Sequence, residues 1–129
     1  MRVLIADDYK IIRVGVGALL RWRMDVDIVE ASNGQEAIEQ ARKTNPDVII
    51  LDLAMPVMTG LEAARRLKEE MPQVPILILS MNDDVHTLAR ELAQIGVEGF
   101  VSKTDVAQKL PHAIETVLAG GTFFGAATR

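Results

Sequence analysis

The sequence contains no cysteine, which excludes disulfide bonds, a cysteine nucleophile and every metal site built on thiolates. Aromatic residues make up only 4% of the chain, too few for a surface on which nucleic-acid bases stack. The apolar runs are short, such as residues 75–79, and none is long enough to cross a bilayer. Two aspartates interrupt the apolar start of the chain, unlike a signal peptide. These absences predict a cytoplasmic protein that does not associate with membranes.

Positive charge is also scarce. The chain has 14 Lys and Arg against 18 Asp and Glu, a net charge of −4, and its densest basic spot is only Arg21-Trp22-Arg23. This balance argues against DNA binding by the chain itself. Its 129 residues, of which 49% are apolar, suit one domain that buries its own core.

Five short runs rich in β-branched residues predict strands, at Val3–Ala6, Asp27–Ala31, Val48–Leu51, Val74–Leu79 and Gly99–Val101. Three of them are continuously apolar rather than alternating, which is typical of strands buried on both faces of a parallel sheet. The segments between the strands have helical spacing, such as Ile12, Val16 and Leu19 on one face. This strict alternation predicts an α/β fold, a doubly wound parallel sheet with helices on both faces.

Local signals predict where the helices begin and end. Ser32 or Asn33 is the expected N-cap of the second helix. Helix stops are expected at Pro72, Gly96 and Gly120-Gly121. A proline is tolerated only near the first turn of a helix, so Pro111 predicts that the last helix begins around Ala107.

Polar residues follow four of the five predicted strands: Asp7-Asp8, Asp52, Ser80 and Ser102-Lys103. In an open parallel sheet the functional site lies beyond the carboxyl ends of the strands. Each residue alone has an ordinary explanation, a helix cap for Asp8 or a solvated surface lysine for Lys103. Three converging carboxylates, however, repel one another unless a cation lies among them. A set of oxygen ligands alone predicts Mg²⁺ rather than zinc.

A divalent cation, an amine and a hydroxyl together suit a phosphoryl group, whose transfer depends on positioning and charge neutralisation. The central position of Asp52 predicts that it is the nucleophile, forming an aspartyl phosphate. Asp7 and Asp8 would hold Mg²⁺, and Lys103 and Ser80 would contact phosphoryl oxygens.

The chain resembles the receiver domain of two-component response regulators. The motifs are VLIADD at 3–8, VIILDLAMPVMTGLEAARRL at 48–67, ILILSMNDD at 76–84 and GFVSK at 99–103. The wording LSMNDD, GFVSKTD and AIETVLAGG is most similar to the NarL/FixJ type, which usually precedes a LuxR-type helix-turn-helix domain. The resemblance implies a flavodoxin-like (βα)5 fold with strand order 2-1-3-4-5. It also implies a receiver domain at 1–121, with 122–129 as a C-terminal tail or the start of an interdomain linker.

The resemblance also implies the role of each site residue. Asp52 is similar to the phospho-acceptor, Asp8 to a direct Mg²⁺ ligand, and Asp7 to a ligand that acts largely through water. The backbone carbonyl of Ala54 matches the third protein ligand. Lys103 is similar to the lysine of the family, and Ser80 and Phe100 to its switch hydroxyl and switch aromatic. Asn82, two residues after Ser80, is a candidate to influence how long the phosphoryl group lasts.

The implied partner is a sensor histidine kinase, with Tyr9, Lys10, Ile11 and Arg13 as candidates for its recognition. DNA would be bound only through an output domain that this chain lacks. The chain would be no enzyme, beyond mediating its own phosphorylation and dephosphorylation. Val14, Gly15 and Gly17 form a smooth patch on the first helix, which suggests an association surface of the first and fifth helices and a homodimer on phosphorylation.

Other classes of function stay open. A haloacid-dehalogenase-type phosphatase also uses an aspartate at a strand end, but it needs a second aspartate where Ala54 stands. A pure binding module has no need of three adjacent carboxylates. The tail favours an excised domain, and the alternative is a stand-alone receiver that acts in a phosphorelay or as a protein-interaction module.

Overall fold

One parallel sheet organises the chain. The computed structural model describes residues 1–81 and 85–124. These residues form five strands in the order β2-β1-β3-β4-β5, so the predicted order and the flavodoxin-like fold are confirmed. The strands are β1 (Arg2–Ala6), β2 (Asp27–Ala31), β3 (Val48–Asp52), β4 (Ile76–Ser80) and β5 (Gly99–Ser102).

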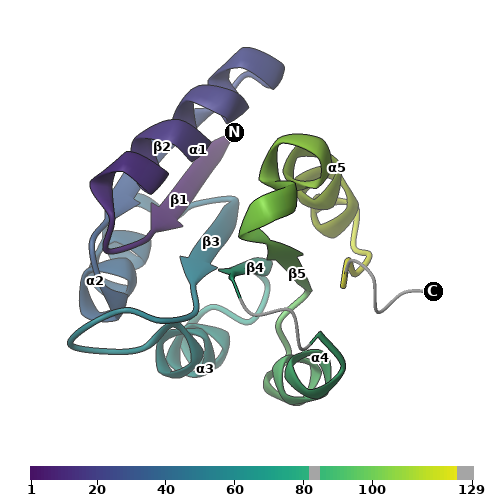
Figure 1. Cartoon of the computed structure of the whole chain (residues 1–129). Helices are drawn as coiled ribbons and strands as arrows, with labels where there is room; N and C mark the ends of the chain where they lie inside the picture. Colours follow the sequence, from purple (N-terminus) through teal and green to yellow (C-terminus); the bar gives the residue numbers. More distant parts are fainter. Residues whose placement is uncertain (82–84, 125–129) are drawn as a thin grey trace.

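Helices cover both faces of the sheet. They are α1 (Lys10–Arg23), α2 (Gly34–Thr44), α3 (Gly60–Glu70), α4 (Val85–Ile95) and α5 (Val106–Leu118), with a 3₁₀ turn at Lys103–Asp105. Figure 1 shows α1 and α5 on one face of the sheet and α2, α3 and α4 on the other. None of these described helices is long and apolar enough to span a membrane.

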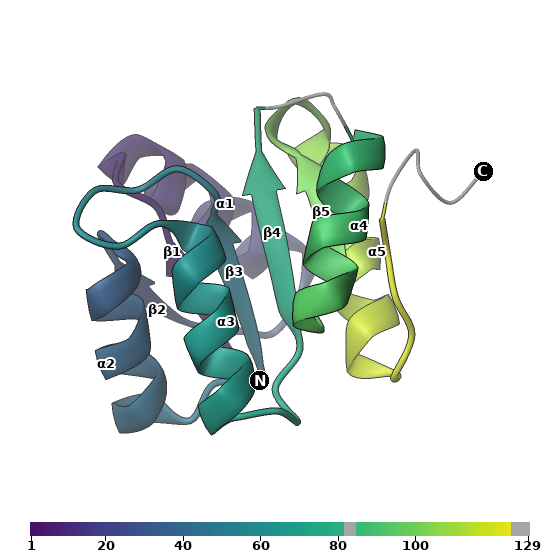
Figure 2. The same ribbon diagram turned by 90° about the horizontal axis from the view of Figure 1, so that it is seen from below.

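The core has two halves, one on each face. Every residue of β3 and β4 is buried, as their continuous apolar runs predict. Leu4, Ile49 and Ile78 point toward α2, α3 and α4, whereas Ile5, Ile50 and Leu79 point toward α1 and α5. Figure 2 shows β4 between β3 and β5, with α3 and α4 across their near face. Burial of the central strands fixes their registers, and therefore the positions of the residues at their ends.

The helix ends mostly follow the local signals. Asn33 is the N-cap of α2, and its side chain accepts a hydrogen bond of 2.9 Å from the backbone N–H of Glu36. Gly96 and Gly120 follow α4 and α5 with positive φ angles of 99° and 93°. α5 begins at Val106, within one residue of the predicted start at Ala107, and Pro111 is its sixth residue. The ring of Pro111 is buried in the core, which offsets the hydrogen bond that it cannot donate.

The chain after α5 returns to the sheet. The N–H of Phe123 donates to the carbonyl of Glu98 at 2.9 Å, and the carbonyl of Phe123 accepts from Phe100 at 2.7 Å. Gly99 permits this approach, since a Cβ there would lie 2.4 Å from the Phe123 carbonyl oxygen. Packing therefore continues to Phe124, beyond the predicted domain end at residue 121, and residues 125–129 lie outside the described part.

The loop from β3 to α3 folds back on the end of β3. The N–H of Gly60 donates to the carbonyl of Leu53 at 2.9 Å. A Cβ on Gly60 would lie 2.0 Å from the backbone oxygen of Asp52, so no other residue fits without moving that strand end.

Two glycine-to-alanine variants test this close approach. Gly60→Ala is expected to lower the free energy of unfolding by about 3 kcal/mol, because the new methyl group overlaps backbone. Gly15→Ala, in the exposed face of α1 with no described atom within 4 Å of the new Cβ, is expected to raise it by about 0.5–1 kcal/mol. Urea denaturation of both variants measures the difference. Equal stability of Gly60→Ala and the wild type would contradict the close approach.

Candidate functional site

Three carboxylates converge at the carboxyl ends of β1 and β3. Asp7 and Asp8 follow β1, and Asp52 is the last residue of β3. One oxygen from each lies within 4.8 Å of the others. Asp7 and Asp52 are buried and Asp8 is exposed. The structure thus brings together the three acids that the strand ends predict.

Lys103 reaches into this cluster from the end of β5. Its Nζ lies 2.9 Å from Asp7 Oδ2 and 3.0 Å from Asp52 Oδ1. Burial acts to lower the pKa of Lys103, but its close contacts with the two carboxylates outweigh burial and raise it. The lysine is therefore a cation that ties both buried aspartates together.

The surroundings of Asp52 disfavour the ionised form of its carboxyl group. Burial is the largest cause and raises the pKa of the Asp52 carboxyl above its ordinary value. The Lys103 contact opposes this effect, and the negative charges of Asp7 and Asp8 add to it. A cation that binds among these carboxylates would relieve their repulsion.

A cavity of about 560 Å³ lies over the cluster, and most of the predicted site residues line it. Its lining includes Asp8, Asp52, Ala54, Ser80 and Lys103. Tyr9, which the sequence predicts only as a candidate for kinase recognition, also lines it. The sequence signal for Tyr9 is its place directly after the acidic pair.

Phe100 does not line this cavity. Its side chain is 1% exposed and packs in the core half that faces α4, near Leu92 and Val97. It lies two residues before Ser102, which pairs in register with Ser80. The aromatic and the hydroxyl are therefore on neighbouring strands. Asn82 lies outside the described residues.

The donor set fits a small, hard divalent cation. All of the clustered side chains are carboxylates, and Mg²⁺ prefers oxygen ligands. Asp7 Oδ2 is buried and accepts no well-aligned hydrogen bond from the described residues, its neighbour being Lys103 Nζ. The cluster is consistent with a metal site in which Asp7, Asp8 and Asp52 supply the charge.

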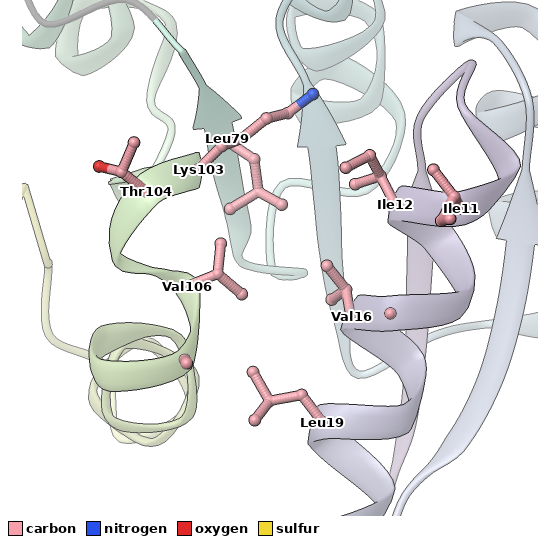
Figure 3. A pocket seen from close by; sticks show the side chains of 10 residues that line it. Ile11, Ile12, Val16, Leu19, Leu79, Lys103, Thr104 and Val106 are labelled. Atoms are coloured by element: carbon pink, nitrogen blue, oxygen red, sulfur yellow. The ribbon is translucent and has the colours of Figure 1, made fainter.

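A second cavity, of about 380 Å³, lies between α1 and α5. Figure 3 shows its apolar walls, with Ile12, Val16 and Leu19 from α1 facing Val106 across it. Lys103 and Leu79 line the cavity too, so it adjoins the acidic cluster. We call this cavity the α1–α5 groove.

The α1 surface differs from the predicted patch in one respect. Val14 is exposed and Gly15 lines the groove, as a patch requires. Gly17, however, is buried against Ile28, so its inclusion in the patch is wrong. The most exposed large apolar side chains of α1 are Ile11 at 80% and Trp22 at 87%, followed by Val14 at 49%.

Comparison with known proteins gives one consistent result. Residues 3–115 match the family model described as "Response regulator receiver domain". The chain is 34% identical over 122 residues to the transcriptional regulatory protein LnrK of Bacillus subtilis (strain 168), covering 94% of this chain and 55% of LnrK. The chain thus spans little more than half the length of that relative.

Solved structures agree with this similarity. A LuxR-family two-component response regulator from Aurantimonas sp. SI85-9A1 has a TM-score of 0.91 and 31% identity, covering 98% of this chain and 90% of that one. The isolated receiver domain of RcsB from Salmonella enterica serovar Typhimurium, with the phosphomimetic BeF3⁻, has a TM-score of 0.87 and 27% identity, covering 98% and 94%. Another structure contains two RcsB dimers bound to two parallel DNAs.

The raised pKa of Asp52 predicts a pH-dependent effect of Asp52→Asn. The folded protein binds the Asp52 proton more tightly than the unfolded chain, so ionised Asp52 costs stability above its raised pKa. Asp52→Asn should therefore raise Tm at pH 7, and this gain should shrink as the pH falls through the raised pKa toward 3.8. Thermal denaturation between pH 4 and 7 without divalent cations measures both effects.

Asp25→Asn is the matched control, since Asp25 is exposed and lies outside the cluster. Its Tm difference from the wild type should change little over the same pH range. A lower Tm for Asp52→Asn at pH 7 would contradict the interpretation.

Proposed function

Because this chain belongs to the family of response regulator receiver domains, we propose that it accepts a phosphoryl group on the side chain of Asp52. The observation that carries this proposal is the contact of one Lys103 amino group with both buried carboxylates, Asp52 at 3.0 Å and Asp7 at 2.9 Å. A buried carboxylate beside an open cavity and a fixed cation is suited to attack a group that carries negative charge.

The proposed reaction transfers the phosphoryl group from a histidine of a sensor kinase. An oxygen of the Asp52 carboxylate attacks phosphorus and forms a P–O bond. The bond from phosphorus to the histidine ring nitrogen breaks, and its electron pair stays with that nitrogen, while the proton on the other ring nitrogen leaves the ring neutral. The products are an aspartyl phosphate and a free imidazole, with no oxidation or reduction.

Each neighbour of Asp52 has a separate task in this proposal. Lys103 pairs with one phosphoryl oxygen, and Ser80 donates a hydrogen bond to another. Asp7, Asp8 and Asp52, with the backbone carbonyl of Ala54, would hold Mg²⁺. When bound, Mg²⁺ neutralises charge on the phosphoryl oxygens. The chain mediates its own phosphorylation and dephosphorylation and turns over no other substrate.

The signal passes from Asp52 to the surface. The phosphoryl group carries about −1.5 to −2 charges beside β4, in place of the single charge of the Asp52 carboxylate. Ser80 moves toward this charge and vacates space into which Phe100, now buried, rotates. The surface formed by β4, α4, β5 and α5 changes as a result. This is a two-state element biased by a local charge.

The output is transcription, controlled through a DNA-binding domain. The relative LnrK is described as a transcriptional regulatory protein, and RcsB dimers are seen bound to DNA. The net charge of the sequence is −4, which disfavours DNA contacts by this chain, so DNA would contact the output domain. A stand-alone receiver in a phosphorelay is the alternative. The reading frame of the gene distinguishes the two, since only a transcription factor encodes a helix-turn-helix domain after the receiver.

Asp52→Asn is expected to abolish phosphorylation. Incubation with Mg²⁺ and a small phosphodonor such as acetyl phosphate should label the wild type with acid-labile phosphate and leave Asp52→Asn unlabelled. Asp25→Asn, the exposed control, should incorporate phosphate as the wild type does. Phosphate retained by Asp52→Asn would sink the assignment.

The phosphorylated chain forms a homodimer through α1 in our proposal. Ile11 and Trp22 on α1 expose most of their apolar surface, and Ile11 also lines the α1–α5 groove. Two-fold packing of this face would remove both from water. A solved structure contains dimers of the relative RcsB, which supports dimerisation without specifying the face.

The dimer is tested by light scattering. The wild type with Mg²⁺ and BeF3⁻ should approach twice the monomer mass, and Ile11→Glu should remain a monomer because it places charge on the proposed face. Val57→Glu is the matched control, since Val57 is as exposed at 83% but lies in the loop after β3. A wild type that stays monomeric at high concentration would exclude the homodimer.

A further inference from the structure

Arg13 connects three parts of the chain beside the acidic cluster. It lies in the first turns of α1, and its side chain is only 14% exposed. Its Nη1 donates to the backbone carbonyl of Asp7 at 2.7 Å, and its Nε donates to Glu30 Oε1, at the end of β2, at 2.8 Å. One guanidinium therefore joins the start of α1 to the ends of β1 and β2.

The Arg13 contact completes the restraint of Asp7. The N–H of Asp7 donates to the carbonyl of Ala31 at 3.1 Å, and Asp7 Oδ1 accepts from the N–H of Tyr9 at 2.9 Å. Asp7 Oδ2 lies 2.9 Å from Lys103 Nζ. With Arg13 on its carbonyl oxygen, the backbone and Oδ1 of Asp7 are held by hydrogen bonds, and Oδ2 lies against the Lys103 ammonium.

The start of α1 has few other restraints. Side chains cap α2 and α3, where Asn33 and Thr59 accept hydrogen bonds from backbone N–H groups. At α1 the N-cap is Tyr9, whose side chain makes no capping hydrogen bond, and its N–H donates to Asp7 Oδ1 instead. Asp7, Asp8 and Tyr9 form the short connection from β1 to α1, and Arg13 holds this connection at the Asp7 carbonyl.

Arg13 also places a positive charge near the Asp7 carboxylate without contacting its oxygens. It contacts the main chain of Asp7, whereas Lys103 contacts the carboxylate oxygens. The ligand oxygens of Asp7 and Asp8 are thus free of Arg13. This division of roles resembles the outer partners of metal sites, which orient the ligands without touching the metal.

We propose that Arg13 is a positioning residue that orients the Asp7-Asp8 segment for binding a divalent cation. The inference rests on the proposed function, since it concerns the Mg²⁺ site of that function. It differs from the prediction that Arg13 recognises the kinase, because its guanidinium faces Asp7 and Glu30 and is mostly buried.

Positioning and plain charge predict opposite results for Arg13→Ala. If Arg13 acted only through its charge, its loss would remove repulsion and tighten Mg²⁺ binding. If it positions the ligands, its loss weakens Mg²⁺ binding although a positive charge has gone. Arg13→Lys keeps the charge but cannot present two N–H groups in the same fork.

The experiment is a Mg²⁺ titration of the full chain at constant ionic strength, followed by the NMR shifts of the Asp8 and Tyr9 amides, with Tm measured separately. Arg13→Ala and Arg13→Lys are each expected to raise the Kd for Mg²⁺ about tenfold, the lower end of effects at outer partners of metal ligands. Arg42→Ala is the matched control, because Arg42 pairs with Glu70 at 2.7 Å between α2 and α3, away from the cluster. Its Kd should stay within about twofold of the wild type, well below the tenfold effect expected at outer partners of metal ligands.

The outcomes separate the two proposals. Absence of saturable Mg²⁺ binding by the wild type would overturn the proposed function and this inference with it. A wild type that binds Mg²⁺ while Arg13→Ala binds equally well or more tightly would overturn the inference alone. Wild-type affinity in Arg13→Lys would do the same, and this variant decides the matter if Arg13→Ala does not fold. Equal weakening in Arg42→Ala would show general loosening and would also overturn it.

Discussion

The repulsion among three carboxylates within 4.8 Å of one another is the constraint on which the rest of this structure depends. Carboxylates at such distances resist ionisation unless cations balance them. Lys103 balances the two buried acids, Asp7 and Asp52, by reaching both with one amino group. The parallel registers of β1, β3, β4 and β5 bring these side chains together. The sheet thus fixes the strand ends that bring these charged side chains together.

Much of this arrangement could be predicted because buried parallel strands leave clear signals. The apolar runs of β3 and β4 predict their burial, and Asp52 and Ser80 stand where those runs end. The parallel topology then places strand ends on one edge, so no contact between side chains had to be known.

Other features depend on contacts that a local pattern does not contain. Gly17 is adjacent to an exposed patch in sequence, but the rotation of α1 turns it toward Ile28. Phe123 lies in a segment after Gly120-Gly121 that shows no periodicity. Its backbone hydrogen bonds to Glu98 and Phe100 nevertheless fix it against β5. The role of Arg13 likewise depends on its contacts with Asp7, six residues before it, and Glu30, 17 residues after it. No local sequence pattern contains both contacts.

The site and the α1–α5 groove share Lys103, so the charge at Asp52 and the apolar face of α1 meet at one residue. The most direct test of the central claim identifies which carboxylate takes the phosphoryl group. After reaction with acetyl phosphate and Mg²⁺, borohydride reduction converts an aspartyl phosphate to homoserine, which peptide mass spectrometry locates. Homoserine is expected at position 52 alone and only when Mg²⁺ is present. Homoserine at position 7 or 8, or equal yield without Mg²⁺, would contradict the claim.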